Sequence, residues 1–271
     1  MKRIFLALLL AVSTCMAVNV ANASPLPVIP LGTGDITFHW VNYENRVTGL
    51  NQTLSGIFRL DQITDSNGNT LWNNGDLGVE LTGVFSGLQV TSYGGESKGS
   101  QVLFSGGELK VYEGSKNTFD PTKPSTASTG TLWLDANFVT GVDASNPNAT
   151  LVSTIDQLMS TAPVGHNLMC IKGTGTADLD VVGGLNYVVA ALDSNTFERL
   201  DGSGLYADLQ MNNTFYILNA GVAPYNHTYG GYDVYSSDPV GAYATPEPGT
   251  ICLLGAGLLG LGIFGRKRMR G

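Results

Sequence analysis

Hydrophobic and polar residues alternate along much of the chain, and the pattern is clearest at residues 35–41. Ile36, Phe38 and Trp40 would fall on one face of an extended segment, with Thr37 and His39 on the other. Such alternation predicts a half-buried β-strand. We expect further short strands at residues 54–62, 78–85, 88–93, 101–105, 108–113, 131–139, 168–172, 176–182, 185–192, 205–211, 214–219 and 231–235.

The segments between these predicted strands carry Asn-Gly, Gly-Gly and Ser-Gly pairs. Such pairs supply the positive φ angles of tight hairpin turns. Many short strands joined in this way are typical of an all-β, antiparallel body, either a β-sandwich or a jelly-roll-like fold. A helix is predicted only at residues 151–161, where Ile155, Leu158 and Met159 recur at helical spacing before Pro163, and it would cap one end of the body.

Both ends of the chain have the composition of processing signals. Residues 1–23 begin with two basic residues after Met1, continue with an apolar block and end with Ala21 and Ala23. This arrangement predicts a signal peptide that is cleaved before Ser24.

The C-terminus combines a proline-rich hinge, an apolar run and a basic end. The hinge is followed by apolar residues 251–264, from which we predict a transmembrane helix at about 250–265. Fourteen apolar residues are fewer than the roughly 17–25 of a stable span, so the helix should hold only weakly. A membrane stop at residues 266–270 favours a cytoplasmic C-terminus. The hinge consists of Pro246, Glu247, Pro248 and Gly249, and the stop of Arg266, Lys267, Arg268 and Arg270.

Residues 245–271 resemble the PEP-CTERM sorting domain of bacterial exported proteins, because the hinge, the Gly-interrupted helix and the basic end occur together and in order. The resemblance implies that an exosortase recognises Pro246, Glu247 and Pro248, cuts nearby and releases the body. It also implies export with a transient inner-membrane intermediate, delivery to the cell surface or the extracellular space, and exopolysaccharide as a possible neighbour. Residues 246–271 are therefore expected to be a sorting tail, and signal peptidase and exosortase to be the processing enzymes.

Residues 24–245 are left as one β-rich extracytoplasmic domain with an acidic surface. This body contains eight basic and 21 acidic residues, a net charge of −13. Nucleic acids and anionic lipids require clustered Lys and Arg, so we expect neither as a partner. Divalent cations and neutral glycans remain compatible with the charge.

Motifs for catalysis are weak. Ser203 lies in a Gly-Ser-Gly turn that lacks the first glycine of a nucleophile elbow, and His39, His166 and His227 are too scattered for a zinc site. Asp178 and Asp180 share one face of a predicted strand and could form a glycosidase pair, although a solvated acidic face is the commoner outcome. We therefore assign no catalytic residue and expect no enzymatic activity.

A weak calcium candidate lies between two predicted strands. Asp65, Asn67, Asn69 and Asp76 occupy positions 1, 3, 5 and 12 of a loop rich in oxygen donors. Gly68 is at position 4 rather than 6, and a hairpin closed by Asn67-Gly68 explains the same residues without a metal. No cofactor is therefore assigned, with calcium as the open alternative.

Two further features have both a functional and a structural explanation. Tyr225, Tyr229, Tyr232, Tyr235 and Tyr243 could stack on sugar rings, or they could belong to a last strand at 231–235 and a flexible stalk to the cut site. Cys170, the one cysteine of the body, is expected to be a buried small hydrophobe.

The sequence thus predicts an exported protein of the cell surface or extracellular matrix, with a structural or adhesive role in exopolysaccharide. A carbohydrate-binding module is the first alternative, and a secreted glycan hydrolase is the second.

Overall fold

The computed structural model describes residues 27–161, 169–218 and 232–245. The predicted signal peptide, the sorting motif and the transmembrane helix lie outside these ranges. Residues Ile29–Thr245 form one compact unit. Within the described residues, no helix is both long and apolar enough to span a membrane.

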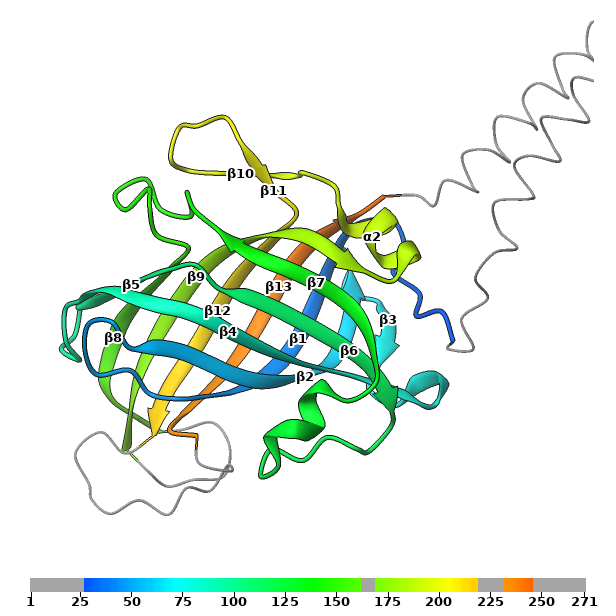
Figure 1. The fold of residues 1–271 in the computed structure, drawn as a ribbon, viewed down its shortest axis with the longest axis horizontal. Coiled ribbons are helices and arrows are strands. Elements are labelled where there is room, and N and C mark those ends of the chain that lie inside the picture. The colour runs from blue at the N-terminus through cyan, green and yellow to red at the C-terminus, as the bar shows by residue number, and fades with distance from the viewer. Residues whose placement is uncertain (1–26, 162–168, 219–231, 246–271) are drawn as a thin grey trace, which may run out of the picture. The chain divides into compact units, whose positions relative to one another are not determined.

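The body is built from antiparallel strands that form a large sheet (Figure 1), and the predicted all-β, antiparallel class is confirmed. The strands of this sheet are β1 (Gly34–Glu44), β2 (Thr53–Asp65), β3 (Thr70–Asn73), β4 (Val79–Tyr93), β5 (Gln101–Ser105), β6 (Glu108–Ser115), β7 (Thr131–Val139), β8 (Leu151–Thr161), β9 (Met169–Gly184), β12 (Leu209–Leu218) and β13 (Val234–Ala244). The remaining elements are the short strands β10 (Phe197–Glu198) and β11 (Tyr206–Ala207), the helix α2 (Asn186–Leu192) and the 3-10 turns η1 (Asp76–Gly78) and η2 (Pro124–Ser128).

The large sheet closes on itself. The strand order β2-β1-β13-β12-β9-β7-β6-β4 returns to its start because β4 also pairs with β2. Along one of its edges, each of the long strands β4 and β9 pairs with two successive strands. Residues 79–86 of β4 pair with β6 and residues 89–93 with β5, while β9 pairs with β7 toward its end and with β8 toward its beginning. Closure leaves few strand edges exposed, and this lowers the risk that the sheet pairs with strands of other chains.

The interior is filled by the inward side of each strand. Along β1, the buried residues are Ile36, Phe38, Trp40, Asn42 and Glu44, so the alternation predicted from residue 35 continues to the end of the strand. The face that begins apolar thus becomes polar toward its end. This change determines where the candidate site lies.

Three glycines make room for inward-facing aromatic rings. Gly56, Gly83 and Gly173 stand directly opposite Phe85, Phe58 and Phe215 on the neighbouring strands. A methyl group on Gly83 would lie 2.2 Å from Cζ of Phe58 and 2.5 Å from the carbonyl oxygen of Lys110. The missing side chain therefore leaves room for the tip of each ring above the opposite backbone.

The helix predicted at residues 151–161 is wrong, because this segment is strand β8. Leu151, Val152 and Ile155 are buried, whereas Leu158, which the helical spacing placed on the apolar face, is 48% exposed. The β-branched residues favour an extended backbone, and pairing with both β5 and β9 supplies the hydrogen bonds.

The strand predicted at residues 185–192 is also wrong, because most of this segment forms α2. Val188, Ala191 and Leu192 are buried at helical spacing against the sheet. A continuous apolar run does not distinguish a buried strand from a short helix that is packed on one side.

The last strand is longer than predicted, and the expected flexible stalk after residue 235 is wrong. β13 runs to Ala244 between β1 and β12, with Val240, Ala242 and Ala244 buried. Its Ser, Gly and Pro residues resemble a linker in the sequence, but two flanking strands hold them extended.

Replacing Gly83 with Ala should lower the free energy of unfolding by about 1–3 kcal/mol, because the added methyl group forces the Phe58 ring or the backbone to move. Denaturant unfolding of the purified variant measures the change. Gly49→Ala is the matched control, since nothing lies within 4 Å of the added methyl group there. Equal stability of the two variants would contradict the close packing of ring and glycine.

Candidate functional site

A cavity of about 70 Å³, partly open to solvent, lies within the closed sheet. Apolar side chains from most strands of the large sheet form the greater part of its wall, among them Leu88, Phe104, Phe138, Leu151 and Met211. A single buried water needs only about 10–15 Å³, so the space is several times larger than one water site. A closed sheet with eight strands in its ring has an interior close to the size at which side chains alone can fill it.

One wall of the cavity is polar and comes mainly from the second half of β1. The Glu44 carboxylate accepts a hydrogen bond of 2.6 Å from Oγ of Ser236 and one from Asn42. Burial raises the pKa of Glu44, and these two hydrogen bonds oppose the shift. The neutral carboxyl form is therefore favoured over a wider pH range than in a free glutamate.

A partly exposed ion pair contributes to the lining. Nε of Arg46 donates to Oε1 of Glu96 over 2.8 Å, and Nη2 donates to Oε2 over 2.5 Å. The pKa of Arg46 is raised, mainly by this hydrogen bonding to Glu96. The pair joins the segment after β1 to the segment after β4. The Glu96 carboxylate balances the positive charge of Arg46.

Trp40 and Asn213, which are among the lining residues, each carry a buried polar atom without a hydrogen-bond partner in the described part of the chain. These are Nε1 of Trp40, a side chain that is 4% exposed, and Oδ1 of Asn213, which is 9% exposed. The Trp40 ring packs against Phe58 with 4.8 Å between ring centroids. Since Phe58 is the ring seated on Gly83, the packing of the sheet fixes the Trp40 ring.

The sequence analysis missed this cavity, although the signal was present in part. Asn42 and Glu44 continue the inward face of Trp40, so a strand extended past residue 41 would have shown two polar residues pointing into a core. Asn213 and Glu96 come from distant segments, and only the closure of the sheet brings them to the same cavity.

Asp178 and Asp180 share one face of β9, as predicted, but Asp178 is buried rather than solvated and Asp180 is only partly exposed. Asp178 is 1% exposed, and Oδ2 of Asp180 accepts a hydrogen bond of 2.6 Å from Nη2 of Arg199. Burial raises the pKa of both carboxyls, and Arg199 opposes the shift.

The segment that contains β10 and β11 packs against this part of β9, and Asp208 attaches the two by hydrogen bonds. One Asp208 oxygen accepts the amide of Val181, and the other accepts the amides of Ser194 and Asn195, all within 2.7–2.8 Å. The acidic residues here hold a hairpin onto β9, and this arrangement does not favour a catalytic role for the aspartate pair.

The four calcium candidates do not converge on one point. Oδ1 of Asp65 accepts the amides of Asn67 and Asn69 and so closes the β2–β3 hairpin, as the structural alternative predicted. Asp76 accepts the amide of Asn73 in a separate turn. No group of three or more His, Cys, Asp or Glu that could hold a metal ion occurs in the described ranges.

The other candidate residues that the structure describes either make hydrogen bonds within the fold or are buried in it. The His39 Nε2 atom lies 3.1 Å from Oγ1 of Thr64, and Ser203 lies in the turn between β10 and β11, where its amide donates to Asp201. The Cys170 side chain is buried, as predicted, and burial raises the pKa of its thiol. His166, Tyr225, Tyr229 and His227 lie outside the described residues.

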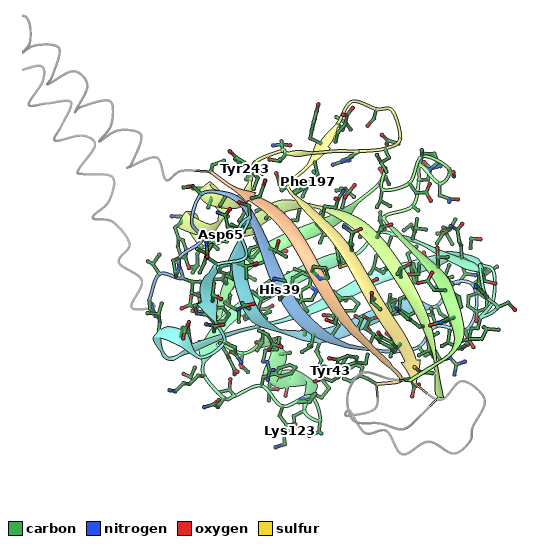
Figure 2. The ribbon with its side chains drawn as sticks, turned by 180° about the vertical axis from the view of Figure 1, so that it is seen from behind. His39, Tyr43, Asp65, Lys123, Phe197 and Tyr243 are labelled. Carbon is green, nitrogen blue, oxygen red and sulfur yellow. The ribbon has the colours of Figure 1, made fainter. Side chains whose placement is uncertain are left out.

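An aromatic cluster lies on the outside of the sheet. Tyr43 of β1 contacts Tyr235 of β13 with ring centroids 5.8 Å apart and Phe119 with centroids 6.1 Å apart. Arg59 lies 6.0 Å from the centre of the Phe119 ring. Figure 2 shows Tyr43 near one end of the sheet and Asp65 near the other, so this cluster is remote from the predicted calcium loop.

Glu113 is an inward-facing carboxyl that the sequence did not single out. It is 1% exposed, and neither of its oxygens has a hydrogen-bond partner among the residues that the structure describes. Burial raises its pKa to about 7.

Comparison with known proteins identifies only the C-terminus. Residues 244–268 match the family model described as the PEP-CTERM protein-sorting motif, which confirms the resemblance seen in the sequence. Comparisons with curated proteins and with solved structures gave no match. The motif supports a secreted protein that is targeted by exosortase sorting and exported through the membrane to the cell surface.

Replacing Glu113 with Gln should remove part of the pH dependence of stability. The folded-state pKa of about 7 lies above the unfolded value near 4.5, so the stabilising effect of protonation is complete below about pH 4.5 and is lost as the pH rises through 7. Relative to the parent, the variant should therefore gain up to about 3 kcal/mol between pH 5 and pH 8.

Denaturant unfolding at both pH values measures this gain. Glu108→Gln on the same strand is the control, because that exposed carboxyl has a pKa lowered by Lys110 and should give no gain at the higher pH. A difference between Glu113→Gln and the parent that does not change with pH would contradict the assignment.

Proposed function

We propose that this protein is a non-catalytic component of the cell surface or extracellular matrix that an exosortase releases from a temporary inner-membrane tether. The PEP-CTERM motif at residues 244–268 supports the sorting step. The matrix role is our inference from the nature of the folded body.

The position at which the folded body ends and the sorting motif begins is the main support for this proposal. The matched region begins at Ala244, the last residue of β13, which is fully buried. Thr245 is also attached to the body, because its amide donates to the carbonyl of Ala191 over 2.8 Å and its hydroxyl donates to that of Ala190 over 2.7 Å. A cut at or after Pro246 would therefore remove no strand and leave the closed sheet complete.

The properties of the body suit a stable extracellular component. Its sheet is closed, so few strand edges are open to pairing, and its net charge of −13 keeps copies apart in solution. Of the aspartate pair that could have suggested hydrolysis, Asp180 is paired with Arg199 and Asp178 is buried. These observations favour a structural role over a glycan hydrolase.

Processing can be tested by the intact mass of the protein recovered from a producing bacterium and from the same strain without its exosortase. We expect a released form ending near Pro248 in the first strain and a cell-bound form that retains Arg270 in the second. Pro246→Ala should behave as the exosortase deletion does. Pro239→Ala, in β13 outside the matched region, is the control and should leave processing intact. A released protein that still contains Arg270 would contradict the proposal.

A carbohydrate-binding role is the second candidate, and the outer aromatic cluster favours it. Tyr43, Tyr235 and Phe119 are partly exposed. The centroid of the Tyr43 ring lies 5.8 Å from that of Tyr235 and 6.1 Å from that of Phe119. Aromatic faces with a nearby guanidinium suit stacking on sugar rings.

Tyr43→Ala should weaken binding to exopolysaccharide from the producing strain by about tenfold, roughly the loss of one 1–1.5 kcal/mol aromatic contact. Affinity electrophoresis with the polysaccharide in the gel measures this change. Tyr206→Ala serves as the control, because this exposed tyrosine lies on β11 outside the cluster. If both variants migrate like the parent while the parent is retarded, the cluster is not the binding surface.

A further inference from the structure

We propose that the surface of the body around Thr245 is a contact surface for the exosortase while the enzyme cuts the tail. This inference rests on the proposed sorting function and adds a second contact to the motif itself. The surface consists of Tyr243 and Asp35 on the sheet and of Ala190 and Asp193 at the end of α2, and we call it the exit surface.

The folded body extends to the residue that directly precedes the motif. β13 is paired with β1 as far as Ala244, which is fully buried. Thr245 is then held by α2, because its amide donates to the carbonyl of Ala191 over 2.8 Å and its hydroxyl donates to the carbonyl of Ala190 over 2.7 Å. The sequence therefore contains no linker between the last attached residue and the Pro-Glu-Pro tripeptide.

The attachment of Thr245 is part of the fold of α2. Carbonyl groups in the last turn of a helix have no partner within the helix, and Thr245 binds two of them. The helix itself is fixed to the sheet, since Val188, Ala191 and Leu192 are buried in the main core. Detaching Thr245 would expose these carbonyls and loosen the helix, so we expect the attachment to persist while the enzyme cuts.

Chain geometry limits how far the body can lie from the enzyme. Five residues, 246–250, separate Thr245 from the apolar run that begins at Ile251. Fully extended, they span at most about 17–18 Å. A small protein domain is about 30 Å across. An enzyme that holds this short segment in a cleft must therefore lie against the surface of the body next to Thr245.

The exit surface has exposed side chains on both sides of Thr245. Tyr243 is 38% exposed, and Asp35, its partner on β1, is exposed as well. On the other side, Ala190 and Asp193 are exposed at the end of α2. These four residues are the nearest exposed positions to Thr245 along β13, β1 and α2.

The chemistry of the exit surface indicates the kind of enzyme surface that it fits. A tyrosine offers an apolar ring and a polar hydroxyl, a combination that is enriched at protein interfaces. Asp35 and Asp193 place two carboxyl groups beside it. We therefore expect the entrance of the exosortase cleft to be positively charged where it meets this surface, because complementary charge speeds the encounter of two proteins.

The test follows the full-length protein in the producing strain by pulse labelling and intact mass. The measured quantity is the half-time for conversion of the cell-bound form, which retains Arg270, to the released form. The combined substitutions Tyr243→Ala, Asp35→Lys and Asp193→Lys should lengthen this half-time at least fivefold. The thermal midpoint of the purified variant checks that the body still folds.

A spacer separates a lost contact from a defect in folding or export. Twelve Gly and Ser residues inserted between Thr245 and Pro246 add up to about 40 Å of chain, more than the width of a small domain. The enzyme can then bind the motif without touching the body. With this spacer, the same three substitutions should change the half-time less than twofold, whereas a folding or export defect would persist.

Leu50→Lys is the control for a change at the other end of the sheet. β1 runs from Gly34, opposite Ala244, to Glu44, opposite Val234, and Leu50 lies in the turn beyond that end with 59% of its surface exposed. Figure 2 shows the same separation, with Tyr243 and Tyr43 at opposite ends of the sheet. The Leu50 variant should convert at the rate of the parent.

The outcomes distinguish this inference from the sorting proposal. If Pro246→Ala blocks release but the exit-surface variant converts like the parent, only the contact surface is disproved. A slowing that is equally large with the spacer overturns the contact surface as well. If Pro246→Ala is released like the parent, the sorting proposal fails, and the exit surface fails with it.

Discussion

The pairing of β2 with β4 is the constraint on which the rest of this structure depends. It joins the two ends of a run of antiparallel strands, so that the inward faces enclose an interior instead of a flat surface. The pairing itself depends on Gly56 and Gly83, which receive the rings of Phe85 and Phe58 across the same two strands. Larger residues at these glycines would hold the strands apart at the point of closure.

Closure also links packing to the candidate site. Phe58 rests on Gly83, and Trp40 packs on Phe58, so the indole that lines the cavity is held by the contact that closes the sheet. Side chains from β1, β4, β8 and β12 meet around the cavity because the sheet returns to its own edge. The apolar wall and the polar wall therefore come from strands far apart along the chain.

The two functional parts of the chain are organised in different ways. The sorting signal is a contiguous segment whose residues are recognised in sequence, and it begins where β13 ends. The body needs no residue after Thr245 to complete its sheet. Such a division allows export and release to be independent of what the outer aromatic cluster binds.

The sequence alone determined the β-class of the body, the acidic charge and the sorting motif, because each depends on local pattern or on composition. Alternation at residues 35–41 predicted β1, and Asn67-Gly68 predicted the β2–β3 hairpin. Tertiary pairing decided β8 and the length of β13, where neighbouring strands overrode helical spacing and linker-like composition. The tertiary structure also decided the cavity, since Trp40 and Asn213 become neighbours of one space only when distant strands close into a ring.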